Sequence, residues 1–491
     1  MPPVGLRPLR QRRAHGMSPP GPRASIYVRE LHASTQAGGS EKTIMNYADF
    51  IQRKTHVGAD HGFEPTFMPD KLFPFQRALV EWAVRKGRGM LACDCGLGKT
   101  PMQLTHAQNV VAKTNRRVLI LAPLSVAPQT VREGEKFGIE VVHRRDGIKP
   151  VDKIVVTNYE RLHHFNPSDF EMVICDESSI LKNFDGSTRQ VVTEFMRKTP
   201  YRLLCTATAA PNDYIELGTS SEALGELERK HMMAQFFVHD GGETAKWELK
   251  GHAKDHLFWR WVCTWARAMR KPSDIGFDDG PFRLPALNVR KHTVSASRPL
   301  DGYLFDLPAV GLQEQRSDLR RTMRERCEMA AQLINAHDRP AVAWCNLNEE
   351  SHVLTRLING AVEVKGDDTE EQKEESLNAF ASGSIRVLVT KSSICGFGLN
   401  WQHCAHTTMF PSHSYEQYYQ SVRRFWRFGQ KNPVTVDMIT TDGQDNVLVN
   451  LTRKSEAADR MFDNLVSMMW QELKVTKQTE YTKKEEVPSW L

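Results

Sequence analysis

Short runs of Val, Ile and Leu alternate with segments of helical length along most of the chain, in two separate series. In the first series, the runs lie at 117–123, 152–158, 170–177 and 201–208. In the second, they lie at 341–346, 361–366, 385–390, 406–410 and 434–440. Strands that are apolar throughout are typical of parallel sheets with helices on both faces. Because 491 residues are too many for one hydrophobic core, the two series predict two α/β lobes.

Composition marks the start of the chain as different from the rest. Residues 1–44 are rich in Pro, Arg, Gly and Ser, so we expect disorder there. They hold seven basic and two acidic residues, and therefore most of the net charge of +6. The remainder is nearly neutral, so net charge alone does not argue for a polyanionic partner. No apolar run approaches the length of a membrane span or a signal peptide, and we expect a cytoplasmic protein without membrane contact.

These features give an expected domain plan. A first lobe would occupy 45–290 and a second lobe 291–475, followed by a charged tail at 476–491. The first lobe would carry a Trp-rich insertion at about 220–290. In the insertion, four apolar residues recur at three- and four-residue steps, namely Phe258, Trp261, Trp265 and Met269. This spacing predicts one face of an amphipathic helix that packs in the core, with base stacking as the alternative.

The nine cysteines are scattered, and only Cys93 and Cys95 stand close together. No second close pair completes a four-ligand zinc site. Most of the others lie in apolar runs, which favours buried reduced thiols. Metal binding by Cys93 and Cys95 remains the alternative.

Those two cysteines open a stretch that continues as Gly-Leu-Gly-Lys-Thr, residues 96–100. A strand-like run precedes it and a helix-compatible segment follows, which is the context that a phosphate-binding loop needs. Lys99 would reach the β- and γ-phosphates of a nucleotide, and the Thr100 hydroxyl would hold Mg²⁺. Cys93 replaces the first glycine of the usual pattern.

A strand ending in Asp176 and Glu177 supplies the acidic partners of such a loop. Asp176 would hold Mg²⁺ through water, and Glu177 would orient or deprotonate the attacking water. The alternative is an ordinary acidic helix cap. Further along, Gln420, Arg424 and Arg427 fall on one helical face. Two arginines on one face could contact a triphosphate from the second lobe. The alternatives are an ordinary solvent-exposed basic face and contacts to nucleic-acid phosphates.

With these residues, the chain resembles helicase superfamily two and, within it, the SWI/SNF-type DNA translocases, most closely the short versions in bacteriophages and prophages. The resemblance covers about 68–455 and rests on eight segments: LFPFQRALVEW, CDCGLGKT, LILAPLSVAPQTVREGEKF, VVTNYERL, DESSILKN, TATAAPND, LVTKSSICGFGLNWQ and QSVRRFWRFGQ. It implies two tandem RecA-like lobes with ATP and Mg²⁺ in the cleft between them. It also implies that Gln76 contacts the adenine and that Gly96 and Gly98 form the phosphate loop.

The same resemblance implies contacts to a polynucleotide at Ser125, Thr157, Thr390 and Lys391. Departures lie at Ser178 and Ser179, where the family has Ala-His, and at Trp426, where it has His. The coupling motif reads Thr-Ala-Thr-Ala-Ala-Pro. We expect an ATP-dependent translocase on DNA, with duplex favoured. The alternatives are a strand-separating DNA or RNA helicase and a nucleic-acid-binding scaffold whose ATPase has decayed.

Overall fold

The computed structural model describes most of the chain. The described residues are 59–123, 126–182, 186–210, 213–239, 247–251, 257–295, 317, 319–395, 399–441 and 444–480. The predictions for residues 1–44, for Ser125 and for the last eleven residues of the tail lie outside these ranges. Within them, every helix is either too short or too polar to reach across a bilayer.

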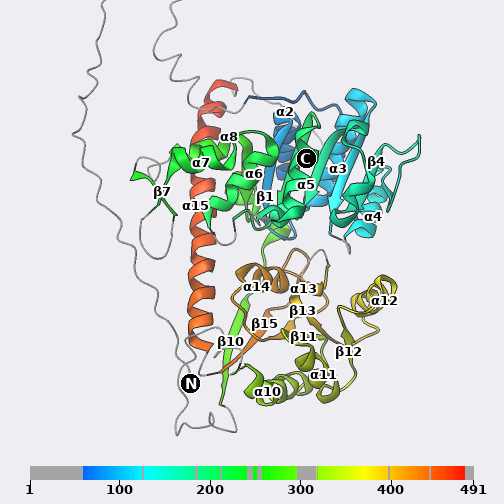
Figure 1. The fold of residues 1–491 in the computed structure, drawn as a ribbon, viewed down its shortest axis with the longest axis vertical. Coiled ribbons are helices and arrows are strands. Elements are labelled where there is room, and N and C mark those ends of the chain that lie inside the picture. Colours follow the sequence, from blue (N-terminus) through cyan, green and yellow to red (C-terminus); the bar gives the residue numbers. More distant parts are fainter. Residues whose placement is uncertain are drawn as a thin grey trace, which may run out of the picture. The chain divides into compact units, whose positions relative to one another are not determined.

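The first lobe is built on a seven-stranded sheet in which all neighbouring strands are parallel, in the order β3-β4-β2-β5-β6-β1-β9 (Figure 1). Its strands are β1 (Arg88–Cys93), β2 (Arg117–Ala122), β3 (Val142–His143), β4 (Ile154–Asn158), β5 (Phe170–Asp176), β6 (Tyr201–Thr206) and β9 (Ala266–Met269). Its helices are α2 (Pro74–Lys86), α3 (Lys99–Thr114), α4 (Ala127–Phe137), α5 (Ser187–Arg197), α6 (Leu217–Leu224), α7 (Arg229–Phe236) and α8 (Phe258–Trp265). A short antiparallel pair, β7 (Phe237–His239) and β8 (Trp247–Leu249), follows α7.

The second lobe has a six-stranded parallel sheet in the order β10-β15-β14-β11-β13-β12. Its strands are β10 (Leu287–Val294), β11 (Ala341–Cys345), β12 (Ala361–Val364), β13 (Val387–Lys391), β14 (His406–Met409) and β15 (Val434–Thr441). Its helices are α10 (Met323–Asn335), α11 (Asn348–Leu357), α12 (Glu370–Ala381), α13 (Ser392–Cys395) and α14 (Tyr415–Val422). The prediction of two α/β lobes with parallel sheets is confirmed, and each predicted apolar run contains a strand.

The Trp-rich insertion differs from its prediction at one end. The helix α8 ends at Trp265, and the chain continues as β9, which pairs with β1 from Met90↔Ala266 to Cys93↔Met269. Met269 therefore belongs to an edge strand and not to the helical face. The prediction that the aromatic residues pack in the core is confirmed, because Phe258, Trp261 and Trp265 are all buried.

The basic side chains after α8 make contacts within the protein. The Arg267 guanidinium lies 4.5 Å from the centre of the Trp82 ring and donates to the carbonyl of Cys263, in the last turn of α8. Arg270 pairs with Asp459 at 3.2 Å. Arg267 thus complements the carboxyl end of α8, and Arg270 makes a tertiary ion pair with α15.

The cysteines whose side chains the structure describes are buried and none of these is in a disulfide, which fits the expectation of buried thiols. Cys93 ends β1 inside the first core, and burial raises the pKa of its thiol to about 12. Among the described residues, no group of three or more His, Cys, Asp or Glu side chains is arranged to hold a metal ion.

A chain of polar side chains ties together one edge of the second sheet. Asp437 on β15 lies between His292 on β10 and His406 on β14, with both ring-to-carboxylate distances at 2.8 Å. His406 also contacts His337 at 2.8 Å between ring nitrogens. Because β10 is mostly exposed, these bonds and its backbone ladder hold it against β15. Its polar, exposed sequence is also why the periodicity of apolar residues did not predict this strand.

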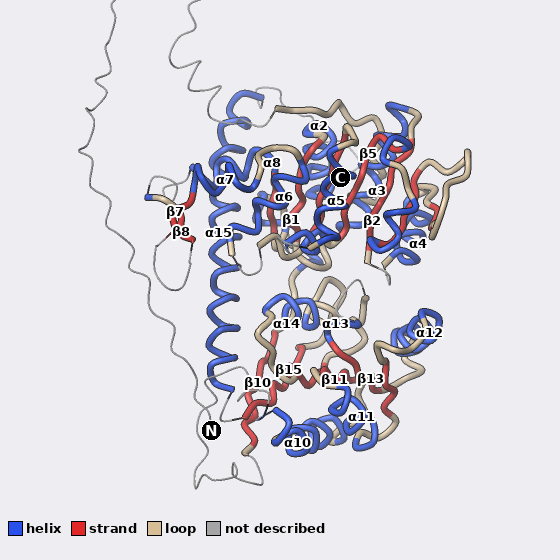
Figure 2. Tube along the Cα trace, viewed as in Figure 1, coloured by secondary structure: helices blue, strands red, loops and turns tan. Residues whose placement is uncertain are grey.

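The last helix, α15 (Asp445–Glu480), starts after β15 but packs on the first lobe. It contacts α8 and β9, and Figures 1 and 2 show it beside α8. Its buried apolar side chains join the first lobe's core and are Met461, Phe462, Leu465, Met468 and Met469. The second lobe as expected from sequence, 291–475, therefore contributes to the core of the first.

Stability of the first lobe is expected to fall in mild acid because of His106 on α3. His106 is 1% exposed, neither ring nitrogen has a hydrogen-bond partner among the described residues, and burial lowers its pKa to about 3. The unfolded chain takes up this proton near pH 6.5, so the folded state loses stability as the pH falls from about 6.5 toward 3. Relative to His106→Leu, the free energy of unfolding should drop by about 2 kcal/mol between pH 7.5 and 5.

Urea titrations of the wild type and His106→Leu at both pH values measure this difference. His163→Leu, a change at an exposed histidine, is the matched control and should leave the pH dependence as in the wild type. Parallel pH dependence in the wild type and His106→Leu would contradict the prediction.

Candidate active site

The loop between β1 and α3 is shaped by two glycines that no other residue could replace without strain. Gly96 has a φ of 87° and Gly98 a φ of 75°, both in the left-handed region. A Cβ atom at Gly96 would lie 2.8 Å from the backbone nitrogen of Phe428, which belongs to the second lobe. A Cβ atom at Gly98 would lie 2.2 Å from Nε2 of Gln76. The glycines thus allow the loop to lie against both α2 and the second lobe.

Lys99, the first residue of α3, folds back over this loop. Its Nζ donates to the carbonyl oxygen of Cys93 at 3.0 Å. Burial by itself would lower the pKa of Lys99, but the nearby Cys95, Glu177 and Asp176 hold it above its ordinary value. The ammonium group is therefore charged and is held by a weak neutral acceptor, which a phosphate oxygen could replace.

Asp176 and Glu177 follow each other at the carboxyl end of β5. Asp176 accepts a hydrogen bond from Nε2 of the buried Gln103 at 2.7 Å, and burial together with the neighbouring Glu177 raises its pKa to about 6. Glu177 has a φ of 50°, a strained value for a side chain of this kind. Its Oε2 is buried and has no hydrogen-bond partner among the described residues. Two crowded carboxylates, one of them unpartnered, fit a cation and a water molecule.

The two arginines come from the segment after α14. Arg424 is buried and donates to the backbone and side-chain oxygens of Gln420 and, at 3.0 Å, to the carbonyl of Leu399. Arg427 donates to the same carbonyl at 3.3 Å. Burial lowers the pKa of Arg427 to about 10, so its guanidinium remains charged at neutral pH.

One cavity of about 310 Å³ is lined by residues of both lobes. It brings together every residue for which the sequence predicted a nucleotide or catalytic role: Gln76, Gly96, Gly98, Lys99, Thr100, Asp176, Glu177, Arg424 and Arg427. Residues more than 300 positions apart in the chain thus face one space. A positively charged end formed by Lys99 and the arginines suits a polyphosphate.

The sequence did not predict the aromatic wall of this cavity. Phe73, Phe282 and Phe428 all line it. The rings of Phe282 and Phe428 stack with their centres 4.5 Å apart, and Phe73 meets Phe282 edge-on at 4.9 Å. Phe282 ends a short 3₁₀ turn (Gly280–Phe282) in a stretch that reads as a loop. An isolated aromatic residue in a loop has no periodicity, so no sequence signal pointed to it.

Gln76 lies beside this wall with its amide already engaged. Its Nε2 donates to the carbonyl of Leu97 at 2.9 Å, and its Oε1 accepts from the backbone nitrogen of Phe73 at 3.0 Å. The side chain therefore braces the phosphate loop against α2. Its predicted contact with adenine would use the hydrogen-bonding capacity that remains.

The residues predicted to contact a polynucleotide are not brought together in the same way. Thr157 in β4 and Thr390 in β13 have no exposed surface, and the Thr390 hydroxyl donates to the carbonyl of Val364 at 3.0 Å. Both stand at interior positions of a sheet and offer no surface to a phosphate in this structure, so direct phosphate contacts by these two side chains stay a prediction. Lys391 is half-buried and donates to Oδ1 of Asn348.

A second and larger cavity, of about 540 Å³, is lined by segments adjacent to those predicted contacts. Pro123 and Tyr159 come from the first lobe, and Ser393 and Ile394 from the second. Glu177 lines this cavity as well as the first. A group bound in the larger cavity would therefore lie against a carboxylate of the smaller one.

Two families match separate parts of the chain. Residues 70–210 match the family described as "Type III restriction enzyme, res subunit", and residues 325–429 match "Helicase conserved C-terminal domain". The two matched ranges fall in the first and second lobes, and each contains part of the cavity lining.

Curated relatives are mammalian proteins named "DNA annealing helicase and endonuclease ZRANB3". The mouse protein is 28% identical over 239 residues, 44% of this chain and 22% of its own length. The bovine protein is 27% identical over 215 residues, 38% of this chain and 20% of its own length. The chain thus spans about a fifth of the length of these relatives. The similarity to short phage versions stays a prediction.

Among solved structures, the chain is similar to one titled "Sulfolobus solfataricus SWI2/SNF2 ATPase core in complex with dsDNA". The sequence identity is 15% and the TM-score 0.39. The match covers 85% of this chain and 98% of the other.

Proposed function

Because the chain belongs to helicase superfamily two, of the SWI/SNF type, we propose that it is a DNA-dependent ATPase that uses ATP hydrolysis to move along duplex DNA. The observation that carries this proposal is the single cavity lined by Lys99, Glu177 and Arg427. The ZRANB3 relatives carry DNA in their printed name, which supports DNA as the polynucleotide.

In the proposed reaction, the triphosphate lies along the loop between β1 and α3. Lys99 exchanges its bond to the Cys93 carbonyl for oxygens of the β- and γ-phosphates. Glu177, whose Oε2 lacks a protein partner among the described residues, orients the attacking water. Arg427 and Arg424 stabilise the charge that develops on the transferred phosphoryl group.

Thr100 and Asp176 are the residues that would hold Mg²⁺. The fit is supported by the crowding of Asp176 and Glu177, which raises the pKa of Asp176 to about 6 and which a bound cation would relieve. When bound, Mg²⁺ supplies charge neutralisation at the phosphate oxygens.

Movement requires that the affinity for the polynucleotide depends on whether ATP or its hydrolysis products are bound. Glu177 lines both cavities, so a strand lying in the larger one would contact the wall of the catalytic one. We propose that DNA binds across this larger cavity. Lys391 lines a separate cavity that shares Ser393 and Ile394 with it. The lobes would then approach with ATP bound and separate after hydrolysis, and the difference in DNA affinity between the two states would give direction.

The proposal predicts phosphate release that depends on DNA and on salt. Release should be slow without polymer and rise with duplex DNA, and the apparent DNA affinity should fall with a log–log slope of about −0.9 per phosphate contact. Parallel assays with single-stranded DNA, duplex DNA and RNA at several salt concentrations measure this. A rate of ATP hydrolysis that changes neither with added polymer nor with salt concentration would contradict the proposal.

Two further assays separate the alternatives. Displacement of a third strand from a triplex reports movement on a duplex, whereas unwinding of a forked duplex reports strand separation. Activity in the fork assay alone would identify a strand-separating helicase. No turnover with any polymer, together with retained DNA binding, would identify a scaffold with a decayed ATPase.

A further inference from the structure

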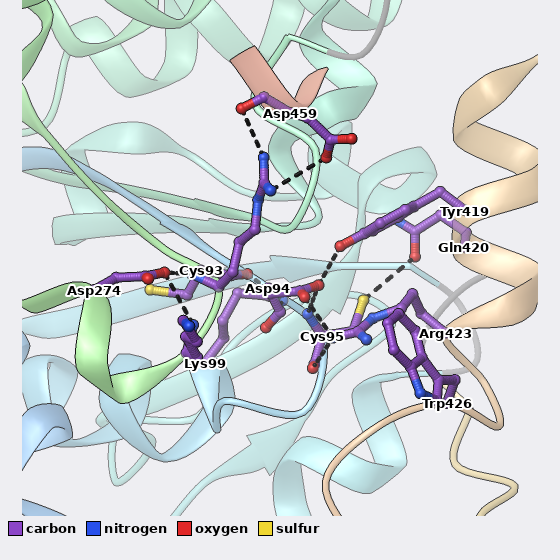
Figure 3. Close-up of polar contacts among 12 residues, drawn as sticks. Cys93, Asp94, Cys95, Lys99, Asp274, Tyr419, Gln420, Arg423, Trp426 and Asp459 are labelled. Carbon is purple, nitrogen blue, oxygen red and sulfur yellow. Dashed lines mark hydrogen bonds and ion pairs between the residues drawn. The ribbon is translucent and has the colours of Figure 1, made fainter. Parts of the chain in front are cut away.

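A cluster of contacts joins the phosphate loop of the first lobe to one face of the second lobe, apart from the arginines described above. The carboxylate of Asp94 accepts hydrogen bonds from the Tyr419 hydroxyl, from the Arg423 guanidinium and from the backbone nitrogen of Cys95 (Figure 3). Arg423 also donates to the Cys95 carbonyl at 2.9 Å. Asp94 and Arg423 thus form an ion pair in which each side chain also makes further hydrogen bonds, Asp94 with Tyr419 and Cys95, and Arg423 with the Cys95 carbonyl.

This ion pair is shielded from water. The side chain of Arg423 is 3% exposed and that of Asp94 is 10% exposed. The Arg423 guanidinium lies 5.0 Å from the ring centre of Trp426 and 5.8 Å from that of Tyr419. A buried charge that loses its partner is costly, so each of the two residues needs the other.

The same cluster of contacts is connected to Arg424 through Gln420. The Cys95 thiol lies 4.0 Å from Oε1 of Gln420, and this oxygen accepts a hydrogen bond from Arg424 at 2.9 Å. Three residues separated by steps of one and three positions, Tyr419, Gln420 and Arg423, therefore contact Asp94 or Cys95. The next residue after Arg423 is Arg424, so the position of the ion pair fixes the position of its neighbour.

We propose that Asp94 and Arg423 are positioning residues, which set Arg424 and Arg427 against the phosphate loop for ATP hydrolysis. This inference rests on the function proposed above. It gives a role to Trp426, which replaces the family's histidine and packs on Arg423. Its indole nitrogen donates to the carbonyl of Pro285 at 2.7 Å, which anchors the ring.

The test is a double-mutant cycle on the full chain with Asp94→Asn, Arg423→Met and the double variant. We expect each single change to lower kcat by about 30-fold or more, because one buried charge is left unpaired. Binding of a fluorescent ATP analogue should change much less than kcat, since Lys99 is untouched. The kcat of the double variant should be at least about tenfold higher than the value obtained by multiplying the two single losses, because the two residues act together.

Two additions keep the test decisive. Arg423→Lys retains the charge and should recover part of kcat, and thermal unfolding of each variant shows which proteins are folded. Lys431→Gln, a change at an exposed cation in the same segment, is the matched control and should leave kcat as in the wild type.

Single effects that multiply in the double variant, or a folded Arg423→Met with wild-type kcat, would overturn the positioning role while leaving the ATPase in place. If Arg423→Met does not fold, a double variant with wild-type kcat overturns it. A wild type that does not hydrolyse ATP overturns both the inference and the proposed function.

Discussion

Replacing Arg427 with alanine is expected to lower kcat by about 10³-fold or more while nucleotide binding changes little. An arginine that meets the transferred phosphoryl group is worth roughly 10³ to 10⁵ in rate where this has been measured. Arg427 lines the cavity from the second lobe, and the one hydrogen bond found between its guanidinium and the described residues, to the Leu399 carbonyl, is long at 3.3 Å. The guanidinium is thus free to turn toward a phosphate, and its charge persists at neutral pH.

Single-turnover phosphate release and binding of a fluorescent ATP analogue separate the rate from the affinity. Lys431→Ala removes an exposed positive charge four residues away and serves as the control for a general change in potential. If Arg427→Ala weakened binding and left kcat unchanged, Arg427 would contact the nucleotide in the ground state only.

Lys99→Ala is expected to reduce ATP turnover to background, a loss of about 10³-fold or more. Lys99 is half-buried at the start of α3, near the two carboxylates, and it is the cation of the loop proposed to bind the phosphates. Alanine would leave Asp176 and Glu177 without the charge that opposes them, so ATP would meet repulsion where it now meets an ammonium group. Both kcat and binding should therefore suffer, in contrast to Arg427→Ala.

Phosphate release with saturating DNA measures this loss, and Lys113→Ala provides the control. Lys113 is exposed and lies in the last turn of the same helix. Its substitution therefore removes a lysine from α3 without changing the loop before the helix. Turnover in Lys99→Ala close to that of the wild type would place the phosphates elsewhere.

The sequence brought forward the residues that line the smaller cavity because their signals are local; their catalytic roles stay predictions. Lys99 and Thr100 follow their glycines directly, Asp176 and Glu177 end an apolar strand, and the arginines share one helical face. Each of these patterns is read within a few residues, and parallel sheets place the carboxyl ends of their strands at one edge. The cavity between the lobes then joins patterns that the sequence keeps far apart.

The features that the sequence missed depend on tertiary neighbours. The strand β9 forms because β1 has a free edge beside it, which overrides the helical spacing from Phe258 to Met269. Phe282 acquires its place through stacking on Phe428. The burial of Thr157 and Thr390 was not foreseen either, because a resemblance between segments does not distinguish a strand's interior from the loop that follows it.

The return of α15 to the first lobe has a practical consequence for dissecting the protein. Met461, Phe462 and Leu465 belong to a helix that the ribosome makes long after the sheet on which they pack. An N-terminal half expressed alone would present the bare patch that this helix covers and would be prone to aggregate. Biochemical separation of the halves therefore requires that the helix be supplied to the N-terminal half, either in trans or by circular permutation.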